Sequence, residues 1–127
     1  MIVAKRKYNS SDRIGCGTVA SNASTDIQIN DLICWDKNGL LVSVFGDVTN
    51  IECFAGLGRI ISPPFQKSEY DYNIVFGYNK ADANLADCGK KVFVSATNTL
   101  SKTGTVYVGR IVDVEPNKFW WIDTTLS

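Results

Sequence analysis

Apolar residues in this chain occur in short runs separated by polar turns, most clearly in residues 90–123. Three runs there, at 92–94, 106–114 and 119–122, are rich in Val, Ile and aromatic residues, which suit the pleated, half-buried surface of a strand. Asn and Pro stand between the runs, where the chain can turn. The pattern therefore predicts three strands joined by two turns.

The earlier part of the chain alternates in the same way. Asn38-Gly39 lies between two apolar runs and predicts a hairpin, because both residue types accept positive φ. Residues 66–73 are largely polar and are expected to form a connection, and residues 81–88 are expected to contain the only helical turn. Further strands are predicted at residues 14–19, 26–30, 32–35, 40–45, 51–55, 57–61 and 74–78.

Two segments of the first half have an echo in the second half. The matched segments are 33–35 with 92–94 and 57–61 with 108–112. The first copy carries an insert at residues 44–54, and the Pro63-Pro64 elbow stands between the copies in this alignment. Two explanations remain open: a duplicated β unit around one core, or chance similarity between amphipathic strands.

These observations predict a mainly β fold: a single-domain β-sandwich or barrel-like fold with short strands and at most one short helix. A chain of 127 residues suits one domain. Residues 1–13 are expected to form a flexible N-terminal arm, and residues 14–127 the β domain.

Charge and residue usage narrow the range of functions. Thirteen basic residues balance thirteen acidic ones, which disfavours general nucleic-acid binding. The chain has no histidine, which removes the usual general base and the commonest metal ligand. Asp113 and Glu115 share a strand face but adjoin a turn, so solvated charges explain them better than acid–base chemistry. We expect no catalytic residue, no enzyme activity and no cofactor.

The four cysteines are Cys16, Cys34, Cys53 and Cys88, and no two of them form a CxxC pair. A zinc site usually contains at least one close pair, so no metal site is expected. The sequence shows neither a signal peptide nor an apolar stretch of membrane-spanning length. We therefore expect unbridged thiols in a reducing compartment, most of them buried.

Aromatic and basic residues are the candidates for a binding role. Trp120 and Trp121 are adjacent, so a strand would direct one inward and one outward. An outward Trp with Tyr107 could stack on a sugar or fill a pocket of a partner, although burial of both tryptophans is an open alternative. Arg59 and Arg110 could pair with carboxylates at an interface or lie exposed on their strands. The candidate interface residues are Ile2, Val3, Lys5, Arg6, Lys7, Arg59, Arg110, Trp120 and Trp121.

The order of these motifs resembles that of small tailed-phage head proteins of the decoration, or capsid cement, type. The resemblance covers residues 26–123 and rests on DLICWDKNGLL, a Gly-Arg-Ile strand, GKKVFVSATNTLSKTGTVYVGRIVDV and the closing aromatic strand. The insert at 44–54 and the Pro63-Pro64 elbow depart from the family pattern.

The resemblance implies a β-rich protein that docks on the outer face of a bacteriophage capsid and reinforces the shell. Its partner would be the major capsid protein, with self-association, for example as a trimer, on the capsid lattice. The protein would be located on the capsid exterior of the virion after assembly in the host cytoplasm, with no role for nucleic acid or membrane. The paired tryptophans favour an alternative function, a carbohydrate-binding β module. A small hydrolase is disfavoured by the absence of histidine.

Overall fold

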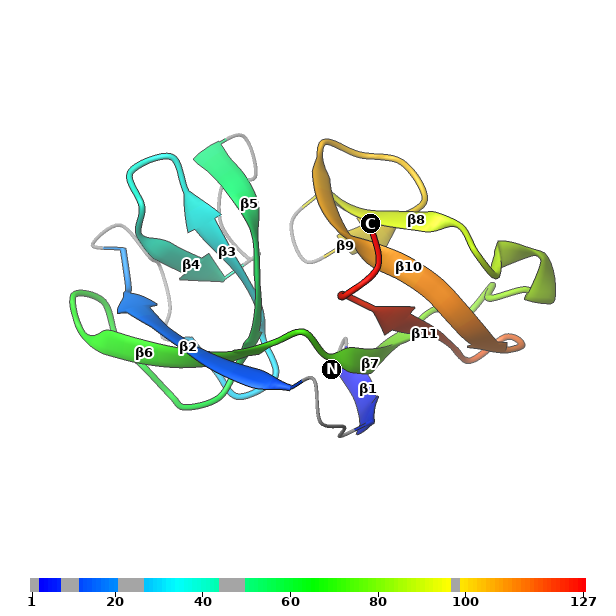
Figure 1. Ribbon diagram of the computed structural model, residues 1–127, viewed down its shortest axis with the longest axis horizontal. Helices are drawn as coiled ribbons and strands as arrows, with labels where there is room; N and C mark the ends of the chain where they lie inside the picture. Colours follow the sequence, from blue (N-terminus) through cyan, green and yellow to red (C-terminus); the bar gives the residue numbers. More distant parts are fainter. Residues whose placement is uncertain (1–2, 8–11, 21–26, 44–49, 97–98) are drawn as a thin grey trace.

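The computed structural model is mainly β, which confirms the predicted fold class (Figure 1). It describes residues 3–7, 12–20, 27–43, 50–96 and 99–127. The strands in these residues are β1 Val3–Lys7, β2 Arg13–Thr18, β3 Leu32–Asp36, β4 Leu41–Ser43, β5 Ile51–Gly58, β6 Lys67–Tyr72, β7 Val75–Asn79, β8 Lys91–Ala96, β9 Thr99–Ser101, β10 Val106–Glu115 and β11 Phe119–Asp123. One 3-10 helix, η2 Leu85–Asp87, lies inside the segment where a helical turn is predicted.

The strands form two antiparallel sheets that pack together as a sandwich. One sheet has six strands in the order β1-β7-β11-β10-β8-β9, and the other has five in the order β2-β6-β5-β3-β4. Figure 1 shows the sheets side by side, with β5 of one facing β10 of the other, and these two strands are in contact. Apart from β1, the five-stranded sheet comes from the N-terminal half of the chain and the six-stranded sheet from the C-terminal half.

The two sheets are copies of one five-stranded unit. From β2 and from β7 onward, the strands follow the same order in space: first, fifth, fourth, second, third. The hairpins also match in register, because Trp35 pairs with Leu41 in the first unit as Val94 pairs with Leu100 in the second. Shared order and shared register establish the duplicated β unit, with β1 as an extra strand on the second copy.

Each unit also carries a β-bulge at the corresponding place. Ala55 in β5 and Val108 in β10 are the extra residues, each followed by a glycine, Gly56 or Gly109. A bulge bends its strand and increases the local twist. Both copies therefore curl at the same point.

The structural equivalence corrects two details of the sequence alignment. Gly109 corresponds to Gly56, whereas the sequence comparison aligned it with Gly58. The Pro63-Pro64 elbow lies inside the first unit, between β5 and β6, and the units meet at residues 73–74. The elbow has a counterpart in the second unit, in the turn between β10 and β11. Phe65, which follows Pro64, has a φ of 67°, and Asn117, which follows Pro116, has a φ of 61°.

Two cores hold the sandwich together. The main core lies between the sheets and includes Leu32, Cys34, Leu57, Ile74, Phe76, Val92, Leu100, Ile111, Trp120 and Ile122. A smaller core of Val19, Ile27, Ile33 and Leu41 lies inside the curl of the five-stranded sheet. The curl brings the end of β2 to β4, where the Ala20 N–H donates to the Leu41 carbonyl oxygen over 2.9 Å.

Several predicted elements differ from the structure. Residues 26–30 are not a strand where the structure describes them: Ile27 forms only an isolated bridge to Ser62. The predicted strands 51–55 and 57–61 fall on one strand, β5, which continues through Gly56 and ends at Gly58, so residues 59–61 are not strand. The polar segment 66–73 is mostly strand β6, whose Ser68 and Asp71 are buried.

The N-terminal segment has a place in the described structure. β1 pairs antiparallel with β7 at the edge of the six-stranded sheet, with Lys7 opposite Val75. Arg13 begins β2, the first strand of the five-stranded sheet. Ile2 and residues 8–11 lie outside the described residues, as do residues 44–49 of the insert. The predicted flexibility of residues 1–13 is not tested here and stays a prediction.

Candidate functional site

Trp120 lies in the core rather than on the surface. Its side chain is almost fully buried, and its indole N–H donates to Asp87 Oδ2 over 2.9 Å. The Lys80 ammonium lies over the ring, 5.2 Å from its centroid. Trp120 therefore offers no free face for a sugar or a partner.

Asp87 collects several donors at the C-terminal end of η2. Lys102 Nζ lies 2.8 Å from Oδ1, and the Asn84 N–H donates to Oδ2 over 3.0 Å. The hydrogen bond from Lys102 is the largest influence and lowers the pKa of Asp87. The neighbouring hollow of about 370 Å³ is also lined by Lys80 and Asp82. Because two cations face two carboxylates here, we interpret the cluster as a structural anchor.

Trp121 points to the other face of β11 and is half-buried. It packs edge-on against Phe119, with ring centroids 5.4 Å apart and planes at 87°. Its backbone lies opposite Gly77 of β7. Of the two adjacent tryptophans, only Trp121 keeps part of its surface accessible.

The two candidate arginines have different intramolecular roles. Arg59 is exposed and lies 3.4 Å from Glu69 Oε1 and 3.3 Å from Asp71 Oδ1. Arg110 donates to the carbonyl oxygens of Ser127 and Gly89 over 2.8 and 2.7 Å. Arg59 therefore ties the end of β5 to β6, and Arg110 holds the C-terminus against the second sheet.

Among the remaining candidates, Val3, Lys5, Arg6 and Lys7 lie together on β1, far in the sequence from the other candidate residues. The structure thus does not gather the predicted residues into one site. They divide between the N-terminal edge strand, the β5–β6 connection, and β10 with β11.

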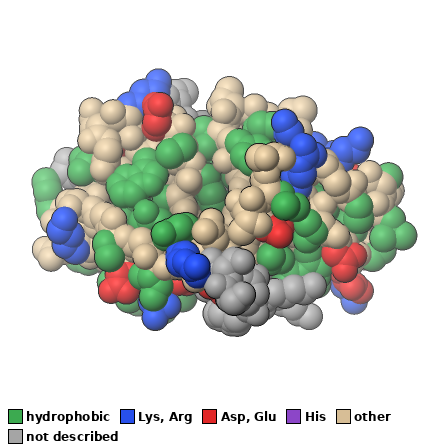
Figure 2. All heavy atoms as spheres, viewed as in Figure 1, with side chains coloured by type: hydrophobic (Ala, Val, Ile, Leu, Met, Phe, Trp, Pro, Cys, Tyr) green, Lys and Arg blue, Asp and Glu red, His purple; other side chains and the backbone are tan. Residues whose placement is uncertain are grey.

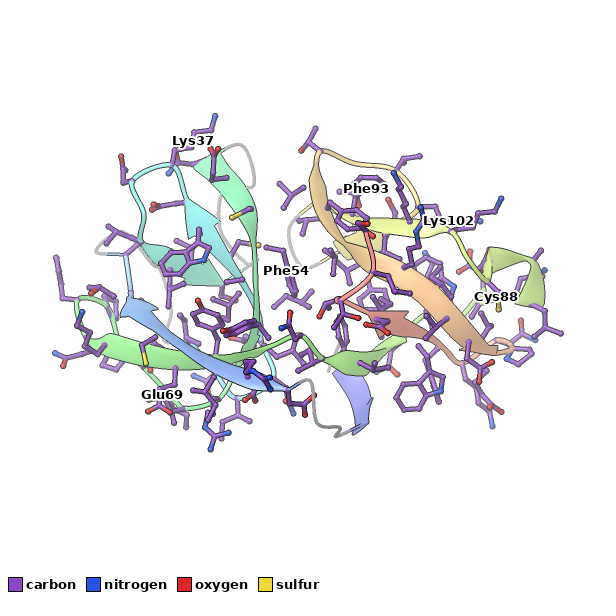
Figure 3. All side chains as sticks on the ribbon, viewed as in Figure 1. Lys37, Phe54, Glu69, Cys88, Phe93 and Lys102 are labelled. Atoms are coloured by element: carbon purple, nitrogen blue, oxygen red, sulfur yellow. The ribbon has the colours of Figure 1, made fainter. Side chains whose placement is uncertain are left out.

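Sequence reasoning missed a hollow between the two units. It measures about 260 Å³, and its aromatic lining residues are Phe54, Tyr72 and Tyr107. Phe54 and Tyr107 occupy equivalent positions, one residue before each bulge. Figure 3 shows Phe54 projecting from β5 toward the second sheet. From the sequence alone, these two residues could have been matched only by aligning the two repeated units in their correct register.

An exposed apolar group was also missed. Segments 27–31 and 58–62 lie side by side, because Ile27 bonds with Ser62 and the turn residues Asn30 and Asp31 bond with Gly58. Ile29 and Ile60 both lie between these two sets of hydrogen bonds. Ile29 and Ile61 are each 58% exposed, and Ile60 is 38% exposed. We call Ile29, Ile60 and Ile61 the isoleucine surface. Figure 2 shows that apolar side chains also reach the surface over both sheets on the face in view.

The cysteines differ from the expectation in their burial. All four are free thiols, but only Cys34 is buried, while Cys16, Cys53 and Cys88 are exposed. Burial raises the pKa of Cys34 to about 12. Cys16 and Cys53 occupy outward-facing positions of strands β2 and β5, since alternate strand residues face solvent, and Cys88 lies outside the strands at the end of η2.

The part of the chain that the structure describes contains neither a metal-binding cluster nor a membrane-spanning helix. In those ranges, no three or more Cys, Asp or Glu side chains come close enough to hold a metal ion. Within the same ranges, no helix has the length and apolar character needed to cross a membrane.

Comparisons with protein-family models, with curated proteins and with solved structures found no match for this chain.

Proposed function

We propose that this protein is a structural virion protein that docks on the outer face of a bacteriophage capsid and reinforces the shell without catalysis. The isoleucine surface carries the proposal. Three isoleucines project to solvent from a sandwich whose two halves share one main core. An exposed apolar group of this kind on a rigid body is typical of a protein-docking surface.

The neighbouring charges fit a docking role. Arg59, next to Ile60, is engaged by Glu69 and Asp71 of the same chain. Paired charges of this kind can form the polar rim of an apolar contact. Covering half of an isoleucine side chain would contribute roughly 1 kcal/mol, and many copies on a lattice reinforce one another.

The basic edge strand β1 supplies a second contact. Lys5, Arg6 and Lys7 lie at the outer edge of the six-stranded sheet. An edge strand can add to a strand of a neighbouring protein through main-chain hydrogen bonds. The major capsid protein is the proposed partner for both surfaces.

Co-sedimentation with shells tests the proposal. Shells assembled from the proposed partner, the major capsid protein, should carry the wild-type protein into the pellet. The double variant Ile29→Lys/Ile61→Lys should remain in the supernatant. Leu85→Lys is the matched control, because Leu85 is 65% exposed on η2, away from the isoleucine surface, and should pellet normally. Wild-type protein that does not pellet with these shells refutes the capsid role.

The hollow between the units favours a second candidate function, recognition of a sugar. Tyr72 and Tyr107 offer aromatic faces, and the lining residue Asn73 offers an amide. Stacking on an aromatic ring combined with amide hydrogen bonds suits a pyranose. The test is a glycan screen of the wild type beside Tyr72→Ala, with Trp121→Phe as control. Binding lost only in Tyr72→Ala supports this function, and no binding by the wild type refutes it.

A further inference from the structure

The outer edge of β2 stands out when the two units are compared. β2 is the terminal strand of the five-stranded sheet and pairs with β6 on one side. On its other side, the described residues cover only its C-terminal end, where Ala20 donates to the Leu41 carbonyl oxygen.

The direction of the backbone groups along β2 follows from two hydrogen bonds. The Val19 N–H donates toward the β6 side, to the Gln66 carbonyl oxygen, and the Ala20 N–H donates to the opposite side. Backbone groups alternate along a strand, and the β2–β6 register is unbroken. The N–H and C=O groups of Ile14 and Cys16 therefore point to the outer edge.

The second unit shows what such an edge accepts. The equivalents of Ile14 and Cys16 are Val75 and Gly77 of β7. There, β1 adds antiparallel, with Lys7 opposite Val75 and Lys5 opposite Gly77. The first unit has no strand in the equivalent position among the described residues.

The charges of the two edges differ. β1 closes its sheet with three consecutive basic residues, Lys5, Arg6 and Lys7, so pairing of this edge with the same edge of a second copy would oppose like charges. Residues 14–17 are Ile-Gly-Cys-Gly, with no charged side chain. Ile14 is 52% exposed, and Cys16 is also exposed.

We propose that the outer edge of β2 joins two copies of this chain, strand β2 to strand β2, antiparallel across a two-fold axis. The contact makes the two five-stranded sheets continuous. A second copy is the fitting occupant, because the described strand that fills the equivalent edge of the second unit, β1, is already paired with β7. The self-contact brings Ile14 and Cys16 of each copy beside those of the other without opposing like charges. The zero net charge of the chain adds no long-range repulsion.

The test measures molecular mass in solution without any capsid component, so it is independent of the proposed capsid role. Light scattering and sedimentation equilibrium, carried to about 1 mM, should show the wild-type mass doubling with concentration. Cys16→Lys places like charges at the contact and should weaken the dimer at least about tenfold, and Cys16→Ser, the matched neutral control, should not. Ile14→Lys should act like Cys16→Lys, whereas Val112→Lys, at an exposed position of the central strand β10, should leave dimerisation unchanged.

Hydrogen exchange locates the contact. The amides of Ile14 and Cys16 should exchange slowly in the dimer and rapidly in Cys16→Lys, whose melting temperature should stay near that of the wild type. A protein that remains monomeric over the whole concentration range overturns the proposal. So does a dimer that survives both lysine variants, or one that leaves the amides of Ile14 and Cys16 unprotected.

Discussion

Trp120 and Asp87 are joined inside the second unit by a hydrogen bond from the indole N–H to Oδ2, 2.9 Å long. The bond ties the loop containing η2 to the closing strand β11. Both side chains are buried. Removing the carboxylate would leave the indole N–H without its acceptor.

We therefore expect Asp87→Ala to lower the free energy of unfolding by about 2–4 kcal/mol, because a buried donor and the Lys102 ammonium lose their partner. Asp82→Ala is the control, since the Asp82 side chain is 82% exposed in the same loop. Urea denaturation of the three proteins measures the difference. Equal losses in both variants would contradict the anchoring role of Asp87.

We also predict that the stability contributed by the Asp87 carboxylate depends on pH. The hydrogen bond from Lys102 lowers the pKa of Asp87 in the folded state. A lowered pKa contributes stability above the unfolded value of about 3.9, and this contribution disappears as the pH falls through the folded value. The stability gap between wild type and Asp87→Asn should be constant near neutrality and shrink below about pH 4. Denaturation series at several pH values check this, and a gap that widens in acid would refute it.

Gly56 and Gly109 test the duplication at its bulges. A Cβ on Gly56 would collide with the Asp71 carbonyl oxygen, and one on Gly109 with that of Asp123. Gly56→Ala and Gly109→Ala should each lower the free energy of unfolding by about 2–3 kcal/mol, because backbone on the neighbouring strand would have to move. Gly39→Asn should be almost neutral, since Gly39 has open space and a φ of +78° that Asn tolerates. Chemical denaturation compares them, and a neutral Gly109→Ala would argue against equivalent bulges.

The thiols should react in two classes. Cys16, Cys53 and Cys88 are exposed, whereas Cys34 is buried with a pKa raised to about 12. We expect maleimide to add to three thiols of the folded protein and to the fourth only in denaturant, because the thiolate is the reactive form. Intact mass before and after unfolding counts the additions. Rapid labelling of Cys34 in the native protein would contradict the observed packing.

We predict that removing the N-terminal arm weakens docking on the capsid but hardly changes the stability of the fold. We consider a variant that lacks residues 1–11. The deletion ends there because Arg13 belongs to β2 and pairs with Tyr72 of β6. Ordering an edge strand costs on the order of 1 kcal/mol per residue, which offsets much of what its pairing contributes. The truncated protein should keep nearly the wild-type melting temperature and bind capsid shells more weakly. A large fall in melting temperature would instead make β1 an integral part of the sheet, and undiminished capsid binding would remove its docking role.

The local pattern of apolar and polar residues was enough to predict the positions of most strands. Residues 92–94, 106–114 and 119–122 are strands as predicted, because β-branched and aromatic runs suit a pleated surface wherever they fold. The hairpin at Asn38-Gly39 also forms, although only Gly39 has positive φ. There the Asp36 carboxylate accepts hydrogen bonds from the N–H groups of Asn38 and Leu40.

Tertiary pairing decided the rest. β6 has a polar sequence and is a strand because β2 and β5 bond to it on both sides, with Arg59 against its Asp71. Alternation required Trp120 and Trp121 to face opposite sides, but only the packing of η2 placed Asp87 where it buries Trp120. The isoleucine surface and the open edge of β2 likewise depend on which strands are neighbours in space. The sequence by itself determined where strands form, since that depends on nearby residues, whereas partners and exposure depend on residues far apart in the chain, which local periodicity does not encode.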